Sequence, residues 1–402
     1  MLQNFLGILS LVPRTFFQIS LLFGISFILV IAGYYPSISV PVPKSTKNYR
    51  DFTEWCLNTA NLDPDARHTV SELLKTSGTS ECKQANQNLS AKTLLLLSDS
   101  KIVDLRPLQS LTNLTGLDLS RNKVFDLMPL QSLTNLTKLY LDSNQISNID
   151  SLKSLTNLTR LSLYSNQISN LSPLSSLTNL VEITLADNQI SDISALQSLT
   201  NLEQLGLGGN QISDLSPLMY ISNLVMLNAR SNQISDISPL KSLTKLTTLT
   251  LNNNQISDIY PLKSLTNLTA IGLDENQIYN IHPLKFLTNI TGLGLSYNKI
   301  SDISPLKSLT KLTDISLNNN QISDISPLRT LTNLTVLWLN DNQISEIHPL
   351  MSLTNLTLVV LLKNQISDIN PLKSLTKLGF LDVQFNPIVN KTCPLSGGSC
   401  QF

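Results

Sequence analysis

Most of the chain repeats one arrangement of apolar and polar positions every 22 residues. Each unit follows the pattern L-x-x-L-x-L-x-x-N-Q-I-S-D-I-x-P-L-x-x-L-T-N, as in residues 246–267. Within it, Leu249 and Leu251 alternate with Thr248 and Thr250, so a short strand places the leucines in a core and the variable residues on an open face. The pattern therefore predicts a stack of similar units, each contributing one short strand.

An asparagine follows the strand of every unit at the same constant step. Because an amide side chain both donates and accepts hydrogen bonds, stacked asparagines can pair backbone groups that a sharp turn would otherwise bury without partners. We therefore predict a structural asparagine ladder. Its members are Asn122, Asn144, Asn166, Asn188, Asn210, Asn232, Asn254, Asn276, Asn298, Asn320, Asn342, Asn364 and Asn386.

A proline recurs on the other side of the unit. Ser238 and Pro239 place a capping residue before a proline at the first helical position, which predicts one short 3₁₀ or α turn with Leu240 and Leu243 pointing inward. Seven buried apolar positions contribute roughly 10–20 kcal/mol. Ordering the backbone of one unit costs roughly 20–40 kcal/mol. A single unit therefore cannot fold alone, and the stack needs a cover at each end.

The limits of the repeat divide the chain. Uninterrupted copies run from residue 114 to residue 377, a degenerate unit precedes them, and the predicted repeat region is residues 92–377. Residues 378–402 form a truncated repeat and a C-terminal cap. Residues 51–91 predict a helical N-terminal cap, because a capping Asp63-Pro64 opens an amphipathic pattern that stops near Gly78. The expected packing residues of this cap are Phe52, Trp55, Leu57, Ala66, Val70, Leu73 and Leu74.

The N-terminus contains a long apolar segment from Phe16 to Tyr35. About 20 apolar residues can span a bilayer, whereas a signal peptide needs a core of roughly 7–15 and a small-residue cleavage site. Residues 1–35 fit both a cleaved signal peptide and a transmembrane anchor, and residues 36–50 form a polar linker. The charges beside this segment do not settle its orientation, so the cysteines are the better guide to the side of the membrane on which the repeats lie. With them, the expected location is membrane-anchored or secreted, with the repeats outside the cytoplasm.

Four cysteines flank the repeats. Cys56 and Cys82 precede them, and Cys393 and Cys400 follow them. Their spacing contains no CxxC and matches no zinc site. One pair at each end of a chain with an export segment predicts the disulfides Cys56–Cys82 and Cys393–Cys400 in an oxidising compartment.

Composition and motifs argue against catalysis and against nucleic-acid binding. The 28 Lys and Arg residues balance 28 Asp and Glu residues, so the chain has no net attraction for polyanions. It contains no nucleophile elbow, phosphate-binding glycine loop or HExxH motif. His282 and His348 occupy the column before the repeated proline, where we expect exposed capping residues, and His68 has no ligand or catalytic partner at a recognisable spacing. We expect no enzyme, no cofactor and no metal.

A column of carboxylates also follows the repeat. One per layer is too few for calcium, which needs six or more converging oxygens, so we expect solvated turn carboxylates. Sequons such as Asn135 and Asn157 are by-products of the LTNLT junction. The acidic column is Asp192, Asp214, Asp236, Asp258, Asp302, Asp324 and Asp368.

The unit LTNLTxLxLxxNQISDIxPLxxL resembles the leucine-rich repeat of bacterial internalins and of internalin-like proteins of cyanobacteria. FTEWC, DARHTVSELL and CPLSGGSC resemble the cysteine-containing ends of the cyanobacterial group. The resemblance covers residues 51–402. It implies an α/β leucine-rich repeat solenoid with a parallel sheet on the concave face, short 3₁₀ or α turns on the convex side, and a helical N-terminal cap. Internalins are surface proteins that bind receptors through the concave face.

Two features of internalins are missing: an immunoglobulin-like module after the array and a Leu-Pro-x-Thr-Gly tail. A host-invasion role is therefore not expected. The repeat also resembles the cytoplasmic regulators of protein phosphatase 1 that share its period, which need neither export nor paired cysteines.

Two groups of outward strand residues are candidate partner-binding surfaces. The N-terminal patch is basic and aromatic, a composition enriched in interface hot spots. The C-terminal patch is contiguous and apolar, which is hard to reconcile with solvated surface, and it is either open or covered by the C-terminal segment or a second chain. Glycines between the patches suggest a featureless spacer or floor, namely Gly206, Gly208, Gly209, Gly272, Gly292 and Gly294. The N-terminal patch is Lys138, Tyr140, Arg160 and Tyr164, and the C-terminal patch is Val336, Trp338, Leu358, Val360, Leu362 and Phe380.

The sequence therefore predicts a noncatalytic, extracytoplasmic interaction protein that binds a protein or glycan through its concave face. One alternative is a structural envelope protein that forms homo-oligomers through the C-terminal patch. Another is a cytoplasmic scaffold similar to the phosphatase regulators. Membrane contact would be made through the N-terminal segment.

Overall fold

The computed structural model describes residues 49–395 and 398–402. The expected export segment, residues 1–35, and all but the end of the expected linker, residues 36–50, lie outside the described residues. Within the described part of the chain, no helix is long and apolar enough to cross a membrane. The described residues belong to one compact unit.

The N-terminal cap consists of α2 (Phe52–Leu57), the 3₁₀ turn η1 (Thr59–Asn61), α3 (Pro64–Ser77) and α4 (Cys82–Ser90). Helix α3 begins after Asp63, whose side chain accepts a hydrogen bond from the Ala66 N–H at 2.9 Å. It ends at Gly78, whose φ of 75° is left-handed. These are the boundaries that the sequence predicted for this helix, because proline favours the first position and glycine the left-handed end.

Leu57 corrects one expectation about the cap. Its side chain is 70% exposed, although the sequence suggested that it packs. Helix α2 buries Phe52, Trp55 and Cys56. Their spacing of three and four residues defines one face of the helix, and the last residue, Leu57, lies off that face.

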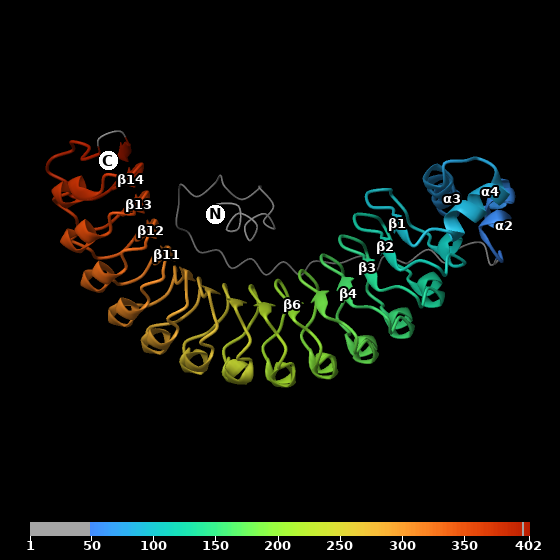
Figure 1. Cartoon of the computed structure of the whole chain (residues 1–402), viewed down its shortest axis with the longest axis horizontal. Helices are drawn as coiled ribbons and strands as arrows, with labels where there is room; N and C mark the ends of the chain where they lie inside the picture. Colours follow the sequence, from blue (N-terminus) through green and yellow to red (C-terminus); the bar gives the residue numbers. More distant parts are fainter. Residues whose placement is uncertain (1–48, 396–397) are drawn as a thin grey trace, which may run out of the picture. The chain divides into compact units, whose positions relative to one another are not determined.

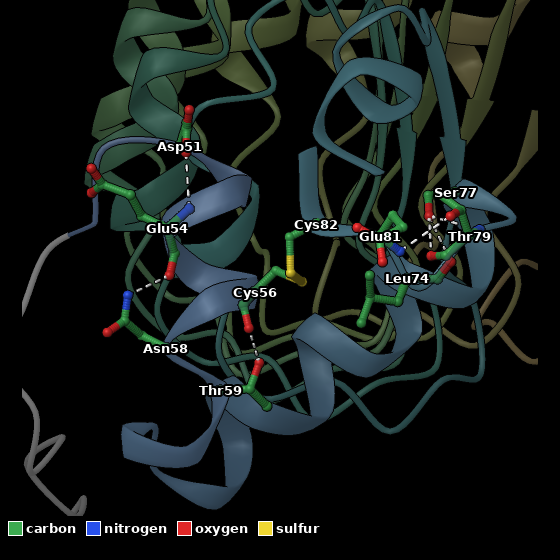
Figure 2. Close-up of a disulfide and its surroundings, with 10 residues drawn as sticks. All are labelled: Asp51, Glu54, Cys56, Asn58, Thr59, Leu74, Ser77, Thr79, Glu81 and Cys82. Carbon is green, nitrogen blue, oxygen red and sulfur yellow. Dashed lines mark hydrogen bonds between the residues drawn. A yellow bond between two sulfur atoms is a disulfide. The ribbon is translucent and has the colours of Figure 1, made fainter. Parts of the chain in front are cut away.

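The disulfide Cys56–Cys82 joins α2 to the start of α4, with the two Cα atoms 5.6 Å apart (Figure 2). Asp51 caps α2 by accepting the Glu54 N–H at 3.0 Å. At the other end of α2, the Asn58 amide donates to the Glu54 carbonyl at 2.9 Å. Helix α2 is only six residues long, so these caps and the disulfide hold an element that would not be stable alone.

The repeats form one parallel sheet in which every strand pairs with the strand of the next repeat. The register is constant, so Leu249 lies between Leu227 and Ile271 in one buried row. Figure 1 shows these strands side by side along the inner side of the array. The strands are β1 (Leu94–Leu96), β2 (Gly116–Asp118), β3 (Lys138–Tyr140), β4 (Arg160–Ser162), β5 (Glu182–Thr184), β6 (Gln204–Gly206), β7 (Met226–Asn228), β8 (Thr248–Thr250), β9 (Ala270–Gly272), β10 (Gly292–Gly294), β11 (Asp314–Ser316), β12 (Val336–Trp338), β13 (Leu358–Val360), β14 (Phe380–Asp382) and β15 (Ser399–Gln401).

A short 3₁₀ turn lies on the outer side of each repeat (Figure 1). Leu240 in η8 is fully buried, as the repeated Pro-Leu pair predicted. The turns are η2 (Arg106–Leu108), η3 (Met128–Ser132), η4 (Asp150–Ser154), η5 (Ser172–Ser176), η6 (Ser194–Ser198), η7 (Ser216–Tyr220), η8 (Ser238–Ser242), η9 (Tyr260–Ser264), η10 (His282–Phe286), η11 (Ser304–Ser308), η12 (Ser326–Thr330), η13 (His348–Ser352) and η14 (Asn370–Ser374).

The residue that caps these turns differs from the expected one. Ser238 is the first residue of η8, and its N–H donates to the Asp236 carboxylate at 2.8 Å. The carboxylate two residues earlier therefore caps the turn, because a short acidic side chain can reach a backbone N–H two residues on. The whole acidic column, Asp192, Asp214, Asp236, Asp258, Asp302, Asp324 and Asp368, makes this bond. These carboxylates are exposed, but each has a structural hydrogen bond.

The asparagine ladder is present in every repeat from β2 to β14, whereas the degenerate first repeat has Ser100 at this position. Asn254 accepts the Ile234 N–H at 3.0 Å and donates to the Leu251 and Ala229 carbonyls, both at 3.0 Å. The preceding residue, Asn253, has a left-handed φ of 55°. That conformation turns the chain after the strand, and the amide pairs the backbone groups that the turn exposes.

The chain ends in a small closed loop. The disulfide Cys393–Cys400 has its Cα atoms 5.7 Å apart, and β15 pairs with β14 so that Cys400 lies opposite Leu381. Leu395 and Phe402 are partly buried against the core. The C-terminal segment therefore extends the sheet by one strand.

Candidate functional site

The open surface of the sheet is built from three columns of outward residues. The first and third residues of each strand face outward, and so does the residue two positions after the strand. In β12 these are Val336, Trp338 and Asn340, whereas Leu337 and Leu339 are fully buried. The same alternation in neighbouring strands places side chains from different repeats next to one another on one face.

The C-terminal patch is the largest apolar part of this face. Val336, Leu358 and Phe380 lie opposite one another in the register of β12, β13 and β14, so they form a continuous row. All three are half-buried, as is Leu362. Trp338 is 36% exposed. The structure thus brings these five predicted residues together on three adjacent strands.

Val360 does not contribute surface to this patch. Its side chain is only 4% exposed, although the sequence placed it among the outward residues. Val360 lies in register between Trp338 and Asp382. The valine side chain is shorter than those of Trp338 and Asp382, so these two neighbours cover Val360 even though it points outward.

The described part of the C-terminal segment extends the sheet beside the patch. Strand β15 pairs with the free edge of β14, where Ser399 lies opposite Phe380. This continues the sheet sideways and leaves the open face of β12 and β13 unobstructed by the described residues. The exposed part of Trp338 is therefore available to solvent.

The N-terminal patch is partly engaged within the chain. Lys138 and Arg160 are exposed and in register, but Arg160 forms an ion pair with Glu182 at 3.1 Å. Tyr140 and Tyr164 are half-buried. Burial, together with a hydrogen bond to Asp187, raises the pKa of Tyr164 above its usual value. Two of the four predicted residues thus have partners within the molecule.

Two half-buried carboxylates on the concave face were not identified from the sequence as site residues. Asp142 accepts hydrogen bonds from the Ser162 hydroxyl and from the Tyr164 N–H at 2.9 Å. Asp274 accepts the Ser296 N–H at 2.7 Å and the Asn252 amide at 2.9 Å. Burial raises the pKa of both carboxyl groups, and hydrogen bonds oppose this shift.

The central glycines are also more constrained than the expected spacer. A Cβ at Gly272 would collide with the Asn252 side chain, and one at Gly294 would collide with Asp274. These polar side chains lie across the glycine of the next strand. The glycines are therefore needed for the hydrogen-bonded ribbon formed by Asn252, Asp274 and Ser296.

Two exposed leucines extend the face at its N-terminal end. Leu94 and Leu96 in β1 are 56% and 61% exposed. The sequence contained a signal for them: a run of four leucines in a strand must direct two outward, and the degenerate first unit continues the outward columns by one repeat.

The histidines do not form a catalytic arrangement. The Nε2–H of the His68 ring donates one hydrogen bond to the Ser100 carbonyl at 2.7 Å, beside a shallow hollow on α3. His282 begins η10, and its N–H donates to the Asn280 side chain at 3.0 Å, so the capping group is Asn280. His348 faces Glu346 at 3.1 Å on the exposed surface. Among the described residues, no three His, Cys, Asp or Glu side chains are grouped as metal ligands.

A family model described as leucine-rich repeats (2 copies) matches residues 134–176, 178–218, 222–264, 288–330 and 332–374, which together are more than half of the chain. Among curated protein sequences, none matches this chain.

Solved structures of leucine-rich repeat proteins are similar to the chain. An internalin from Listeria monocytogenes is 36% identical with a TM-score of 0.77, and the match covers 80% of this chain and 96% of that one. A leucine-rich repeat protein from Leptospira interrogans is 23% identical with a TM-score of 0.75, and the match covers 89% of this chain and 100% of that one. A plant peptide hormone receptor in complex with its peptide is 21% identical with a TM-score of 0.65, over 74% of this chain and 52% of that receptor.

The matches to the Leptospira protein and to the plant receptor are below 25% identity and show only the fold. The identity and coverage of the internalin match, together with the family model, show family membership. Leucine-rich repeat proteins typically mediate protein interactions, and internalin-like proteins are typically noncatalytic. The chain belongs to the leucine-rich repeat family and is an internalin-like protein.

Proposed function

We propose that this protein is a noncatalytic, extracytoplasmic interaction protein whose concave face binds a protein partner, with Trp338 at the centre of the contact. The observation that carries the proposal is the open C-terminal patch. Trp338 is 36% exposed beside the apolar row of Val336, Leu358 and Phe380. Contiguous exposed apolar surface is typical of interaction sites, and tryptophan is enriched at their energetic centres.

The proposed location rests on the cysteines and on the N-terminal sequence. Both cysteine pairs are within disulfide geometry, and disulfides persist in oxidising compartments. The apolar segment from Phe16 to Tyr35 supplies an export or anchoring signal. This combination favours an extracytoplasmic protein over a cytoplasmic phosphatase-regulator-like scaffold. A protein partner fits the patch better than a glycan, because apart from the Trp338 indole N–H the side chains of the patch offer no hydrogen bonds to hydroxyl groups.

The test measures partner capture and stability on the same variants. The chain is used as bait in envelope extracts, and its thermal midpoint is recorded. We expect Trp338→Ala to abolish capture while lowering the midpoint only slightly, because the side chain already contacts water. Loss of a fully buried aromatic would cost roughly 3–5 kcal/mol. Tyr140→Ala is the matched control for the N-terminal patch and should retain capture.

Two results would count against the proposal. A large loss of midpoint in Trp338→Ala would show that the indole is a structural residue. Unchanged capture by that variant would place the partner elsewhere on the molecule.

A further inference from the structure

Charge divides the concave face into two unequal sections. In the three outward columns, strands β1–β7 carry three cations and three carboxylates: Lys138, Arg160 and Arg230, with Asp118, Asp142 and Glu182. The same columns of β8–β14 carry Asp274, Asp314 and Asp382 and no Lys or Arg. The section that contains the C-terminal patch is therefore acidic, although the whole chain has no net charge.

Two of these carboxylates border the C-terminal patch directly. Asp314 lies opposite Val336 in the pairing of β11 with β12, and Asp382 lies opposite Val360 in the pairing of β13 with β14. Paired residues on neighbouring strands are about 5 Å apart. A carboxylate therefore stands beside the apolar residues on each side of the patch.

These carboxylates have no ion pair with a described residue. Asp314 accepts the Thr313 hydroxyl at 2.6 Å, and Asp382 accepts the Gln384 N–H at 3.0 Å. The nearest cation in sequence to the patch, Lys363, pairs with Asp341 at 3.4 Å on the rim. Hydrogen bonds fix the two carboxylates in place, but no positive charge of the described chain neutralises them.

We propose that the partner presents a cationic polypeptide segment, in which Lys or Arg side chains flank an apolar residue. This inference rests on the proposed function. The apolar residue packs on Trp338 and Leu358, and the cations pair with Asp314 and Asp382. Charge complementarity of this kind sets specificity, and it suppresses acidic partners by repulsion.

A phage-displayed library of random peptides, selected on the immobilised full chain, tests this inference. We expect the recovered peptides to combine apolar residues with an excess of Lys and Arg. Binding of an individual recovered peptide should weaken about fivefold in Asp314→Asn, as for one exposed charge pair. Binding should also weaken as salt is raised. Peptides selected on the Asp314→Lys variant should not show this excess of Lys and Arg.

Asp118→Asn is the matched control. Asp118 is also a half-buried carboxylate in the outward columns, and it accepts the Ser120 N–H at 2.9 Å, but it lies in β2, far from the patch in the sequence. It should leave the recovered peptides bound with unchanged affinity. Thermal midpoints of both variants confirm that each is folded.

The outcomes separate this inference from the function on which it rests. Peptides that require Trp338 but show no excess of Lys and Arg would overturn the inference and leave the proposed function intact. Peptides that bind Trp338→Ala as well as the original chain, or recovery of no peptide that depends on Trp338, would count against both.

Discussion

At the scale of single residues, the same polar bond recurs once per repeat. Asn254 is 8% exposed and holds backbone groups from two neighbouring turns. The adjacent Gln255 is exposed, and its backbone N–H bonds to the Ile234 carbonyl at 2.8 Å, which any side chain permits. Two neighbouring amide residues therefore have different structural importance.

We predict that Asn254→Ala lowers the free energy of unfolding by about 1–3 kcal/mol, because buried backbone groups lose their partner. Gln255→Ala should cost much less. Urea denaturation of both variants measures the difference. Equal losses would refute the structural role assigned to the asparagine ladder.

Half-buried Asp274 gives a prediction about pH. Burial raises its pKa in the folded chain, so its ionised form opposes folding; this cost is absent below the pKa of the unfolded chain and develops as pH rises through the folded pKa. In Asp274→Asn, the new amide can donate to the Asn252 Oδ1, which lacks a partner among the described residues. We expect the stability of this variant relative to the original chain to be more favourable at pH 7 than at pH 4, measured by urea midpoints.

Asp214 is the control, because its pKa is shifted in the opposite direction. Hydrogen bonds from Ser216 lower its pKa, so its ionised form favours folding above the unfolded pKa, and that contribution disappears as pH falls. The relative stability of Asp214→Asn should therefore be less favourable at pH 7 than at about pH 2.5, which lies below the pKa of the unfolded chain. The same pH trend in both variants would contradict these assignments.

Residue-scale predictions succeeded where the repeat alone determines the environment. The ladder asparagines and buried leucines have the same neighbours in every repeat, so one pattern describes them all. Val360 and Asp236 show where this reasoning stops. The burial of Val360 depends on the size of the residues beside it, and the capping role of Asp236 depends on the backbone path between two elements.

At the scale of elements, charge holds the cap to the repeats, whereas the disulfide Cys56–Cys82 links two helices within the cap. Arg106 in η2 pairs with Asp63 at 2.6 Å and with Asp104 at 2.5 Å. Its guanidinium also lies 5.5 Å from the ring centroid of Trp55 in α2. One residue of the first repeats thus contacts two elements of the cap.

We predict that replacing Cys56 and Cys82 together by serine destabilises the N-terminal end locally, because each repeat depends mainly on its neighbours. Loss of a disulfide commonly costs about 2–4 kcal/mol. Hydrogen exchange should become faster in α2, α4 and β1 and stay unchanged in β8.

The C-terminal pair is the control for this effect. Replacing Cys393 and Cys400 by serine should accelerate exchange in β14 and β15 without affecting α2. Uniform acceleration along the array in either variant would mean that the solenoid unfolds as a single cooperative unit.

Helix α3 was predictable, whereas α2 and α4 were not, and the reason is local. Helix α3 has a capping aspartate, a proline at its first position, a regular apolar stripe and a terminal glycine. Helix α4 buries only Ala85 and Leu89, and no side chain caps its start. A short polar segment of this kind becomes helical because the disulfide and the core beneath it favour that conformation.

At the scale of the whole molecule, the open patch raises the question of self-association. The free edge of β14 is already paired by β15, so that edge offers no strand for a second chain. The routes left to a dimer are the outer edge of the three-residue strand β15 and the C-terminal patch. We predict that residues 45–402 are monomeric by light scattering. A dimer that Trp338→Ala dissociates would instead favour a self-associating envelope protein.

The sequence by itself determined the repeat, its strand and core positions, the asparagine ladder and the capped α3. These features follow from spacing along one chain, which repeats the same burial in every unit. The tertiary structure decided which outward residues are accessible, which side chains pair across repeats, and which residues adopt strained backbone. Tyr297 and Phe385 have φ values of 55° and 57°, a region that such bulky residues seldom adopt. Nothing in their identity signals it. At Tyr297 the conformation is held by hydrogen bonds to both neighbouring repeats, because its N–H donates to the Asn318 carbonyl and its carbonyl accepts the Asn276 N–H.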